Sequence, residues 1–160
     1  MRYTILLLIL GASCQLTKVT AQNNTALLLQ NKRFQFSPTT VYPLTGKSRS
    51  VTGSDYFLQL RSDTLSLYLP YFGKSFSSFS NAFTKGGAFD ETFIKNFTYT
   101  LQQNTKNTII KITTQQGDVA KIIMTVYANG TADVTLQSNS RQPIRYFGNI
   151  SAVPFKKKLK

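Results

Sequence analysis

The chain has 160 residues and a formal net charge of +13, because 19 Lys and Arg outnumber 6 Asp and Glu. It contains no histidine and one cysteine, Cys14. This composition excludes the usual general base, the usual zinc ligands and a disulfide framework. The length suits one domain that builds its own core.

The first 21 residues have the order of a secretory signal peptide. An aliphatic run follows Arg2, and small or β-branched residues lead up to Ala21, so cleavage is predicted after Ala21. The run is shorter than the roughly 20 residues of a membrane span, and no transmembrane span is expected after the signal is removed. Lipidation at Cys14 is the alternative, although Leu10 stands one place too early for the usual lipid-attachment motif. Either alternative places the protein in the bacterial periplasm or envelope, the compartment that suits an exported domain without disulfides.

After the signal, three segments differ in composition. Residues 22–33 form an N-terminal segment whose leucines allow a short helix. Residues 34–153 alternate polar and apolar side chains between turns, which predicts a single β-rich domain. Residues 154–160 form a basic C-terminal tail, and a charged run at a terminus usually has no fixed structure.

The first half of the domain predicts one strand and one hairpin. The strand contains Phe34 and Phe36, and Ser37-Pro38 is expected to end it because proline cannot donate to a sheet. The hairpin has the two-residue loop Ser62-Asp63, whose register would put three apolar pairs on one face. The pairs are Leu60 with Leu65, Leu58 with Leu67, and Tyr56 with Leu69.

The second half predicts a meander of strands, and its last hairpin allows a test of register. A two-residue loop would place Val126 opposite Asp133 and mix polar and apolar side chains on both faces. A type I turn in a three-residue loop, Ala128–Gly130, with Gly130 left-handed, brings the apolar sets together instead. It pairs Ile122 with Leu136, Met124 with Val134, and Val126 with Ala132.

Between the two halves, phenylalanines recur at helical spacing after Gly73, with serines between them. This pattern predicts a short helical or aromatic loop segment. Together with the strands it predicts a mainly β fold, an antiparallel meander curled into a barrel or a sandwich. The sequence does not distinguish a barrel from a sandwich.

Two segments that combine proline, an aromatic pair and glycine are the expected corners of the domain. They read Leu-Pro-Tyr-Phe-Gly at residues 69–73 and Arg-x-Pro-Ile-x-Tyr-x-Gly at residues 141–148. With Gly86-Gly87 between them, these segments resemble the exported proteins of domain-of-unknown-function family 4251, found in Bacteroidetes. The resemblance runs from about Phe34 to Ser151. It implies export to the envelope and one β-rich domain, and it supplies no activity, cofactor or catalytic residue.

The two corners are also the candidate site, because their aromatic side chains, including that of Phe147, are expected to meet. A curled sheet often binds ligands at an open mouth. The alternative is that the two tyrosines close the core and hydrogen-bond to backbone groups. The candidate ligand or structural corner consists of Tyr71, Phe72, Gly73, Arg141, Pro143, Tyr146 and Gly148.

No catalytic residue, metal ligand or cofactor site is predicted. Asp90-Glu91 is the one adjacent carboxylate pair. Neighbours on a strand point to opposite faces, so a solvated turn is the expected place for this pair. The function expected is that of an exported, non-enzymatic envelope domain.

The sequence allows two classes of binding partner. The first is a small apolar ligand or a protein partner at the aromatic corner. The second is an anionic polymer such as lipopolysaccharide or an acidic glycan, with nucleic acid the weaker choice. The cations expected beside the aromatic side chains in the second class are Lys74, Lys85, Arg141 and Arg145.

Overall fold

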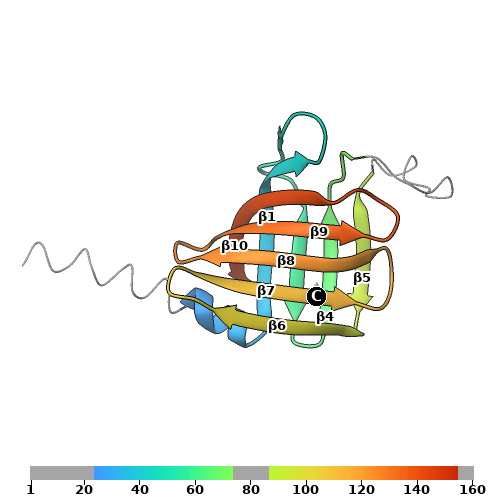
Figure 1. Ribbon diagram of the computed structural model, residues 1–160. Helices are drawn as coiled ribbons and strands as arrows, with labels where there is room; N and C mark the ends of the chain where they lie inside the picture. The colour runs from blue at the N-terminus through green and yellow to red at the C-terminus, as the bar shows by residue number, and fades with distance from the viewer. Residues whose placement is uncertain (1–23, 74–86, 155–160) are drawn as a thin grey trace, which may run out of the picture.

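The computed structural model describes residues 24–73 and 87–154, which form one antiparallel sheet and one short helix. The prediction of a mainly β, antiparallel, curled fold is confirmed, and the sheet forms a half-barrel (Figure 1). The predicted signal peptide, the aromatic segment after Gly73 and the lysines of the tail lie outside the described residues.

The helix covers residues 24–30, and the strands follow it. In the sheet they lie in the order β5-β4-β3-β1-β10-β9-β8-β7-β6, while β2 pairs with β1 alone. Because β1 pairs with both β3 and β10, it joins two meanders, β3 to β5 and β6 to β10. The strands are β1 (Arg33–Pro43), β2 (Arg49–Ser50), β3 (Phe57–Arg61), β4 (Thr64–Leu69), β5 (Phe89–Ile94), β6 (Phe97–Gln103), β7 (Asn107–Thr114), β8 (Val119–Tyr127), β9 (Thr131–Ser138) and β10 (Ile144–Ala152).

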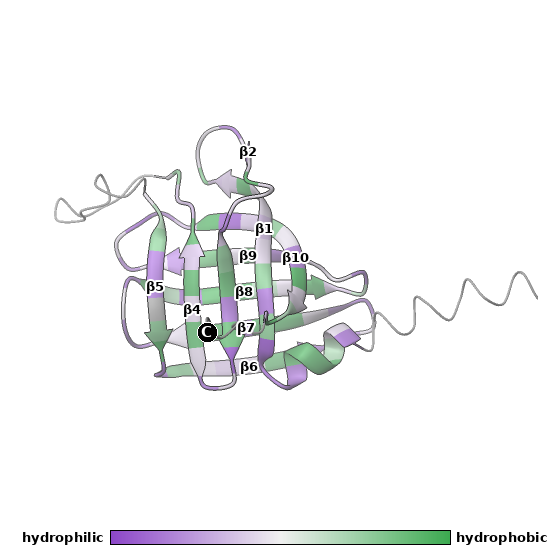
Figure 2. Ribbon diagram, turned by 180° about the vertical axis from the view of Figure 1, so that it is seen from behind, coloured by the Kyte–Doolittle hydropathy of each residue, from purple (hydrophilic) through white to green (hydrophobic). Residues whose placement is uncertain are grey.

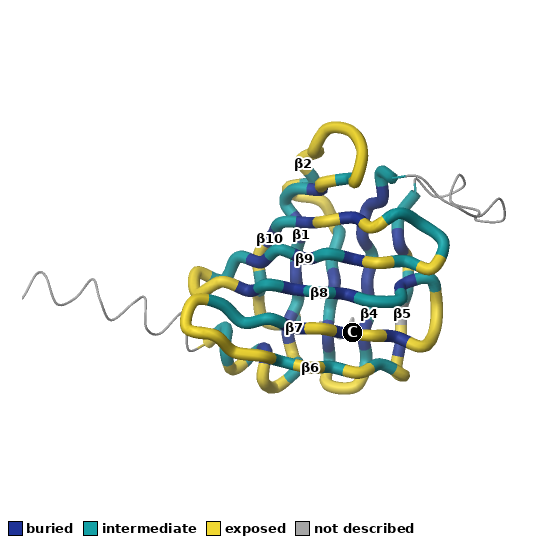
Figure 3. Tube along the Cα trace, viewed as in Figure 1, coloured by how far each residue is buried: buried dark blue, intermediate teal, exposed yellow. Residues whose placement is uncertain are grey.

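The two meanders form two layers that cross. Figure 1 shows β4, β5 and β1 upright behind β6, β7, β8 and β9. Along β8 and β9 buried and half-buried residues alternate, as Figure 3 shows, so that one face of each strand meets the core. The core has contributions from both layers, including Phe34, Phe36, Leu58, Leu67, Ile112, Met124, Val134 and Tyr146.

Both hairpin registers follow the sequence pattern. In β3 and β4, Leu58 pairs with Leu67 and Leu60 with Leu65, as predicted. The ladder begins at Phe57, so the predicted third pair does not form, and the Tyr56 ring packs 5.1 Å from that of Tyr68 instead.

The predicted turn between β8 and β9 is also confirmed. All three expected apolar pairs are present in the ladder. Gly130 has φ +82°, and its N–H donates to the carbonyl oxygen of Tyr127 at 3.0 Å. A residue with a Cβ would be strained at this φ, which is why glycine occupies the position.

The prediction that Ser37-Pro38 ends the first strand is wrong, since β1 continues to Pro43. On one side of β1 the ladder with β3 ends at Phe36, and the ladder with β2 begins at Thr40. Pro38 lies between these ladders, so its missing N–H removes no hydrogen bond from either. A bulge between Pro38 and Thr40 then shifts the register with β10.

The helix lies beside β6 near the start of β1, as Figure 2 shows from behind. Leu29 is buried, and its carbonyl oxygen accepts a hydrogen bond from the Tyr99 hydroxyl on β6 at 2.8 Å. Lys32 lies over the Tyr99 ring, 5.2 Å from its centroid. Within residues 24–73 and 87–154, no helix has the length and apolar character needed to cross a membrane.

Candidate functional site

Two tyrosine hydroxyls join the predicted corners to each other. Tyr146 is fully buried, and its hydroxyl donates to the carbonyl oxygen of Pro70 at 2.8 Å. Tyr71 is 6% exposed, and its hydroxyl donates to the carbonyl oxygen of Gln142 at 3.3 Å. The two segments therefore meet, and we call residues 69–73 and 141–148 together the aromatic corner.

Arg141 ties the aromatic corner to β5 and to the turn before β8. Its Nη1 donates to the carbonyl oxygens of Gly87 and Ala88, at 3.2 Å each. Its Nε lies 3.1 Å from Oδ2 of Asp118, and the Arg141 side chain is 12% exposed. The guanidinium also lies over the Phe89 ring, 4.5 Å from the centroid. Arg141 is thus held on several sides by the protein itself.

The aromatic corner is packed rather than open. A Cβ added at Gly73 would lie 2.7 Å from Cζ of Tyr71, and one added at Gly87 would lie 2.8 Å from the Tyr71 carbonyl oxygen. Phe72 packs against the core, with the Arg49 guanidinium 4.4 Å from its ring centroid. Gly73 and Gly87 therefore pack directly against Tyr71, which is 6% exposed.

Three residues of the second motif do not take part in the contacts of Tyr71, Tyr146 and Arg141 described above. Pro143 is exposed. Phe147 follows Tyr146 on β10 and so points to the opposite face, which contradicts the expectation that the two rings meet. Gly148 lies opposite Pro38 in the ladder between β1 and β10, where the backbones approach closely.

Neither tyrosine of the aromatic corner is suited to act as a base. Burial raises the pKa of Tyr146 well above its ordinary value of 10.0. Burial is also the largest cause of the raised pKa of Tyr71, although the Gln142 backbone and the Arg141 charge oppose it. Both phenols therefore keep their protons at neutral pH.

The predicted solvated turn at Asp90-Glu91 is wrong, because both residues lie in β5. Asp90 is exposed, but Glu91 is half-buried. Oε1 of Glu91 accepts hydrogen bonds from the backbone N–H groups of Asp118 at 2.8 Å and Val119 at 3.0 Å. Oε2 is buried without a hydrogen-bond partner among the described residues. Glu91 therefore ties β5 to the turn between β7 and β8.

Desolvation by burial raises the pKa of Glu91, although the backbone donors Asp118 and Val119 act in the other direction. A raised carboxyl pKa means that the folded state binds the proton more tightly than the unfolded state does. The proton's contribution to stability is complete below the unfolded pKa of about 4.3 and is lost as pH rises through the folded pKa. We therefore expect the stability of the wild type, relative to that of Glu91→Gln, to fall as pH rises across this window. Urea unfolding of both proteins from about pH 4 to pH 8 tests this, and parallel curves would contradict it.

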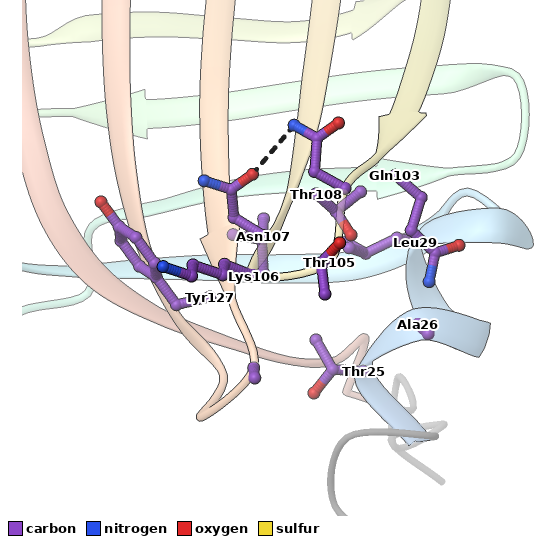
Figure 4. Close-up of a pocket in the computed structure, with 12 residues that line it drawn as sticks. Thr25, Ala26, Leu29, Gln103, Thr105, Lys106, Asn107, Thr108 and Tyr127 are labelled. Carbon is purple, nitrogen blue, oxygen red and sulfur yellow. Dashed lines mark hydrogen bonds between the residues drawn. The ribbon is translucent and has the colours of Figure 1, made fainter.

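A small polar pocket lies between the helix and the ends of β6, β7 and β8 (Figure 4). Thr25 and Ala26 face it from the helix, and Asn104 and Asn107 face it from the turn between β6 and β7. The Asn104 amide donates to Oδ1 of Asn107 at 3.2 Å. The volume of this pocket, about 40 Å³, suits one water molecule rather than an organic ligand.

A larger groove lies on the other side of the helix, with a volume of about 370 Å³. Its apolar surface includes Leu27, which is 55% exposed, and Leu28. Two arginines, Arg33 and Arg61, stand beside this surface. We call this site the helix groove, which is lined by Asn24, Leu27, Leu28, Asn31, Arg33, Arg61, Ala152, Val153 and Pro154.

The helix groove was not predicted from the sequence. Arg33 and Arg61 are separated by many residues in sequence, and each sits in an alternating strand pattern that gives no sign of a site. Only the pairing of β1 with β3 brings them together. Within the described part of the chain, no three His, Cys, Asp or Glu side chains gather as metal ligands.

A curled antiparallel sheet with a packed aromatic corner and an open groove defines a small β-rich domain of the half-barrel type. The chain belongs to the DUF4251 family, described as a domain of unknown function, whose sequence profile matches residues 17–150. The fold is similar to the crystal structure of a DUF4251 family protein from Bacteroides eggerthii DSM 20697, with a TM-score of 0.59 and 14% sequence identity. That match covers 83% of this chain and 88% of the other. No curated protein matches the sequence.

Proposed function

We propose that this protein is an exported, non-enzymatic domain that binds a small ligand with an apolar part in the helix groove. The observation that carries the proposal is the groove itself, whose volume of about 370 Å³ lies in the range of small-molecule sites. Leu27 offers this groove a side chain that is 55% exposed. A ligand that covers this leucine would remove apolar surface from water.

Export is supported by the order of residues 1–21, in which an aliphatic run follows a positive start and small residues precede Ala21. A role without catalysis is supported by residue chemistry. The chain has no histidine, and its one cysteine lies within that leader. The buried tyrosines hold their protons, as argued above for the aromatic corner.

We place the binding site in the helix groove rather than at the aromatic corner, because the polar groups of the corner are already hydrogen-bonded within the protein. Tyr71 and Tyr146 use their hydroxyls on backbone carbonyl oxygens, and glycines pack against Tyr71. The alternative of an anionic polymer on the same corner has less support. Arg141 is paired with Asp118, and Arg145 lies 3.0 Å from Asp133, so neither guanidinium stands without a carboxylate. Lys74 and Lys85, the other two cations of that alternative, lie outside the described residues.

Two leucines of similar exposure provide a test. Leu27 lies in the helix groove, whereas Leu44, 64% exposed, follows the far end of β1. We expect Leu27→Gln to weaken binding of a neutral fluorescent apolar probe such as N-phenyl-1-naphthylamine by about tenfold, since a covered leucine contributes roughly 1.5 kcal/mol. Leu44→Gln should leave the affinity unchanged. Fluorescence titration gives both values, and equal affinities in all three proteins would contradict the proposal.

A further inference from the structure

The helix groove contains an unusual pair of charges. Arg33 on β1 and Arg61 on β3 stand directly opposite each other in the antiparallel ladder. Like charges in such a cross-strand pair destabilise a sheet. Both arginines line the groove, and its lining contains no Asp or Glu.

The neighbours of these arginines do not neutralise them. Arg61 donates from Nε to Oε1 of Gln59 at 2.7 Å and from Nη2 to the Pro154 carbonyl oxygen at 3.4 Å. Both acceptors are uncharged, and they hold Arg61 beside the groove. Within residues 24–73 and 87–154, the ion pairs join Arg141 to Asp118 and Arg145 to Asp133, and no carboxylate pairs with Arg33 or Arg61. The positive charge of the pair is therefore not compensated within the described fold.

From this pair we infer that the ligand of the helix groove is a single-chain amphiphile with a carboxylate head, such as a medium-chain fatty acid. The inference rests on the proposed function, because it names the ligand class of the same groove. The carboxylate lies between Arg33 and Arg61, and the alkyl chain lies on Leu27, Leu28 and Val153. A guanidinium can bind a carboxylate through two parallel hydrogen bonds, which suits a head group placed between two arginines.

The size of the groove suits a single alkyl chain. At roughly 30 Å³ for each water-sized group, a volume of about 370 Å³ holds about ten to twelve carbons. A phospholipid with two long acyl chains exceeds that volume.

Three probes separate the contributions of head and chain. Decanoate carries both, decanol carries the chain alone, and acetate carries the head alone. Calorimetric titration of the purified full chain at neutral pH should show decanoate binding at least about tenfold more tightly than decanol, since only decanoate can form charged hydrogen bonds with the two guanidinium groups. Acetate should not bind measurably. The preference for decanoate should shrink as salt rises from about 0.05 M to about 0.5 M, because both arginines are accessible to solvent.

Charge-removing variants locate the head group. Arg33→Gln/Arg61→Gln should reduce the affinity for decanoate to that for decanol and leave decanol binding unchanged. Arg49→Gln removes the same charge near the opposite end of β1, where Arg49 pairs with Val41, and should change neither affinity. Without ligand, Arg33→Gln/Arg61→Gln should unfold at an equal or higher temperature than the wild type at low salt, because it removes the cross-strand repulsion. Loss of binding could then not be ascribed to unfolding.

The outcomes distinguish this inference from the function on which it rests. Equal affinities for decanoate and decanol, both lowered by Leu27→Gln, would overturn the carboxylate assignment and keep the groove as a binding site. Unchanged decanoate binding in Arg33→Gln/Arg61→Gln would overturn the assignment in the same way. Absence of binding by both decanoate and decanol would overturn both. Sedimentation with anionic phospholipid vesicles, without binding of free decanoate, would also overturn the inference, since it would indicate a membrane surface as the partner.

Discussion

Gly148→Ala is expected to lower the free energy of unfolding by about 3 kcal/mol, near the upper end of what overpacking costs. A Cβ at this position would overlap the carbonyl oxygen of Ser37 and lie 2.8 Å from Cα of Pro38 and 2.9 Å from Cε2 of Phe36. Two of these contacts are backbone atoms, and the third belongs to a fully buried ring. None can move without opening the ladder between β1 and β10. The last glycine of the second motif therefore serves close strand pairing rather than a binding site.

Urea unfolding of Gly148→Ala and the wild type measures this effect, with Asn149→Ala as the control. Asn149 is the next residue on β10 and is exposed, so its truncation should change stability by less than about 0.5 kcal/mol. Equal unfolding midpoints for Gly148→Ala and the wild type would show that β1 and β10 can move apart to admit the methyl group without loss of stability. The role assigned to this glycine would then be wrong.

The registers of two hairpins could be predicted because each depends on residues close in sequence. Leu58 and Leu60 have one arrangement that puts them opposite the leucines of β4 with a two-residue loop. Gly130 similarly fixes the turn between β8 and β9. Pro38 misled the prediction, because its effect depends on where the neighbouring strands end. That information lies in residues far away along the chain.

The candidate site was predicted less well than the fold. The motif pattern predicted that the two segments with Tyr71, Arg141 and Tyr146 meet. It could not show that the polar groups of these side chains are hydrogen-bonded to backbone carbonyl oxygens. Conspicuous aromatic side chains often form core, and here they do. Glu91 was misplaced because its partners are backbone N–H groups, which every residue except proline carries and which leave no mark on a sequence. The arginines of the helix groove become neighbours only through tertiary pairing.

Two arginine–aspartate pairs of nearly equal length are expected to differ greatly in their effect on stability. The Arg141–Asp118 pair spans 3.1 Å with side chains 12% and 26% exposed. The Arg145–Asp133 pair spans 3.0 Å, but its arginine is 55% exposed. We expect Arg141→Ala to lower the free energy of unfolding by about 3 kcal/mol, because it leaves the Asp118 carboxylate and the carbonyl oxygens of Gly87 and Ala88 without their charged partner. Arg145→Ala should lower it by less than about 1 kcal/mol, as exposed ion pairs do.

The second substitution in a double-mutant cycle identifies the cause of the large effect. Oδ1 of Asp118 accepts hydrogen bonds from the Ser138 hydroxyl at 2.7 Å and the Ser140 N–H at 3.1 Å, and an asparagine oxygen can accept both. Asp118→Asn introduced into Arg141→Ala should therefore recover part of the lost stability by removing the unpaired charge. Failure to recover any would indicate that the loss comes instead from the two carbonyl oxygens and the Phe89 ring that Arg141 contacts. Similar losses for Arg141→Ala and Arg145→Ala would contradict the role assigned to the contacts of the buried Arg141 side chain.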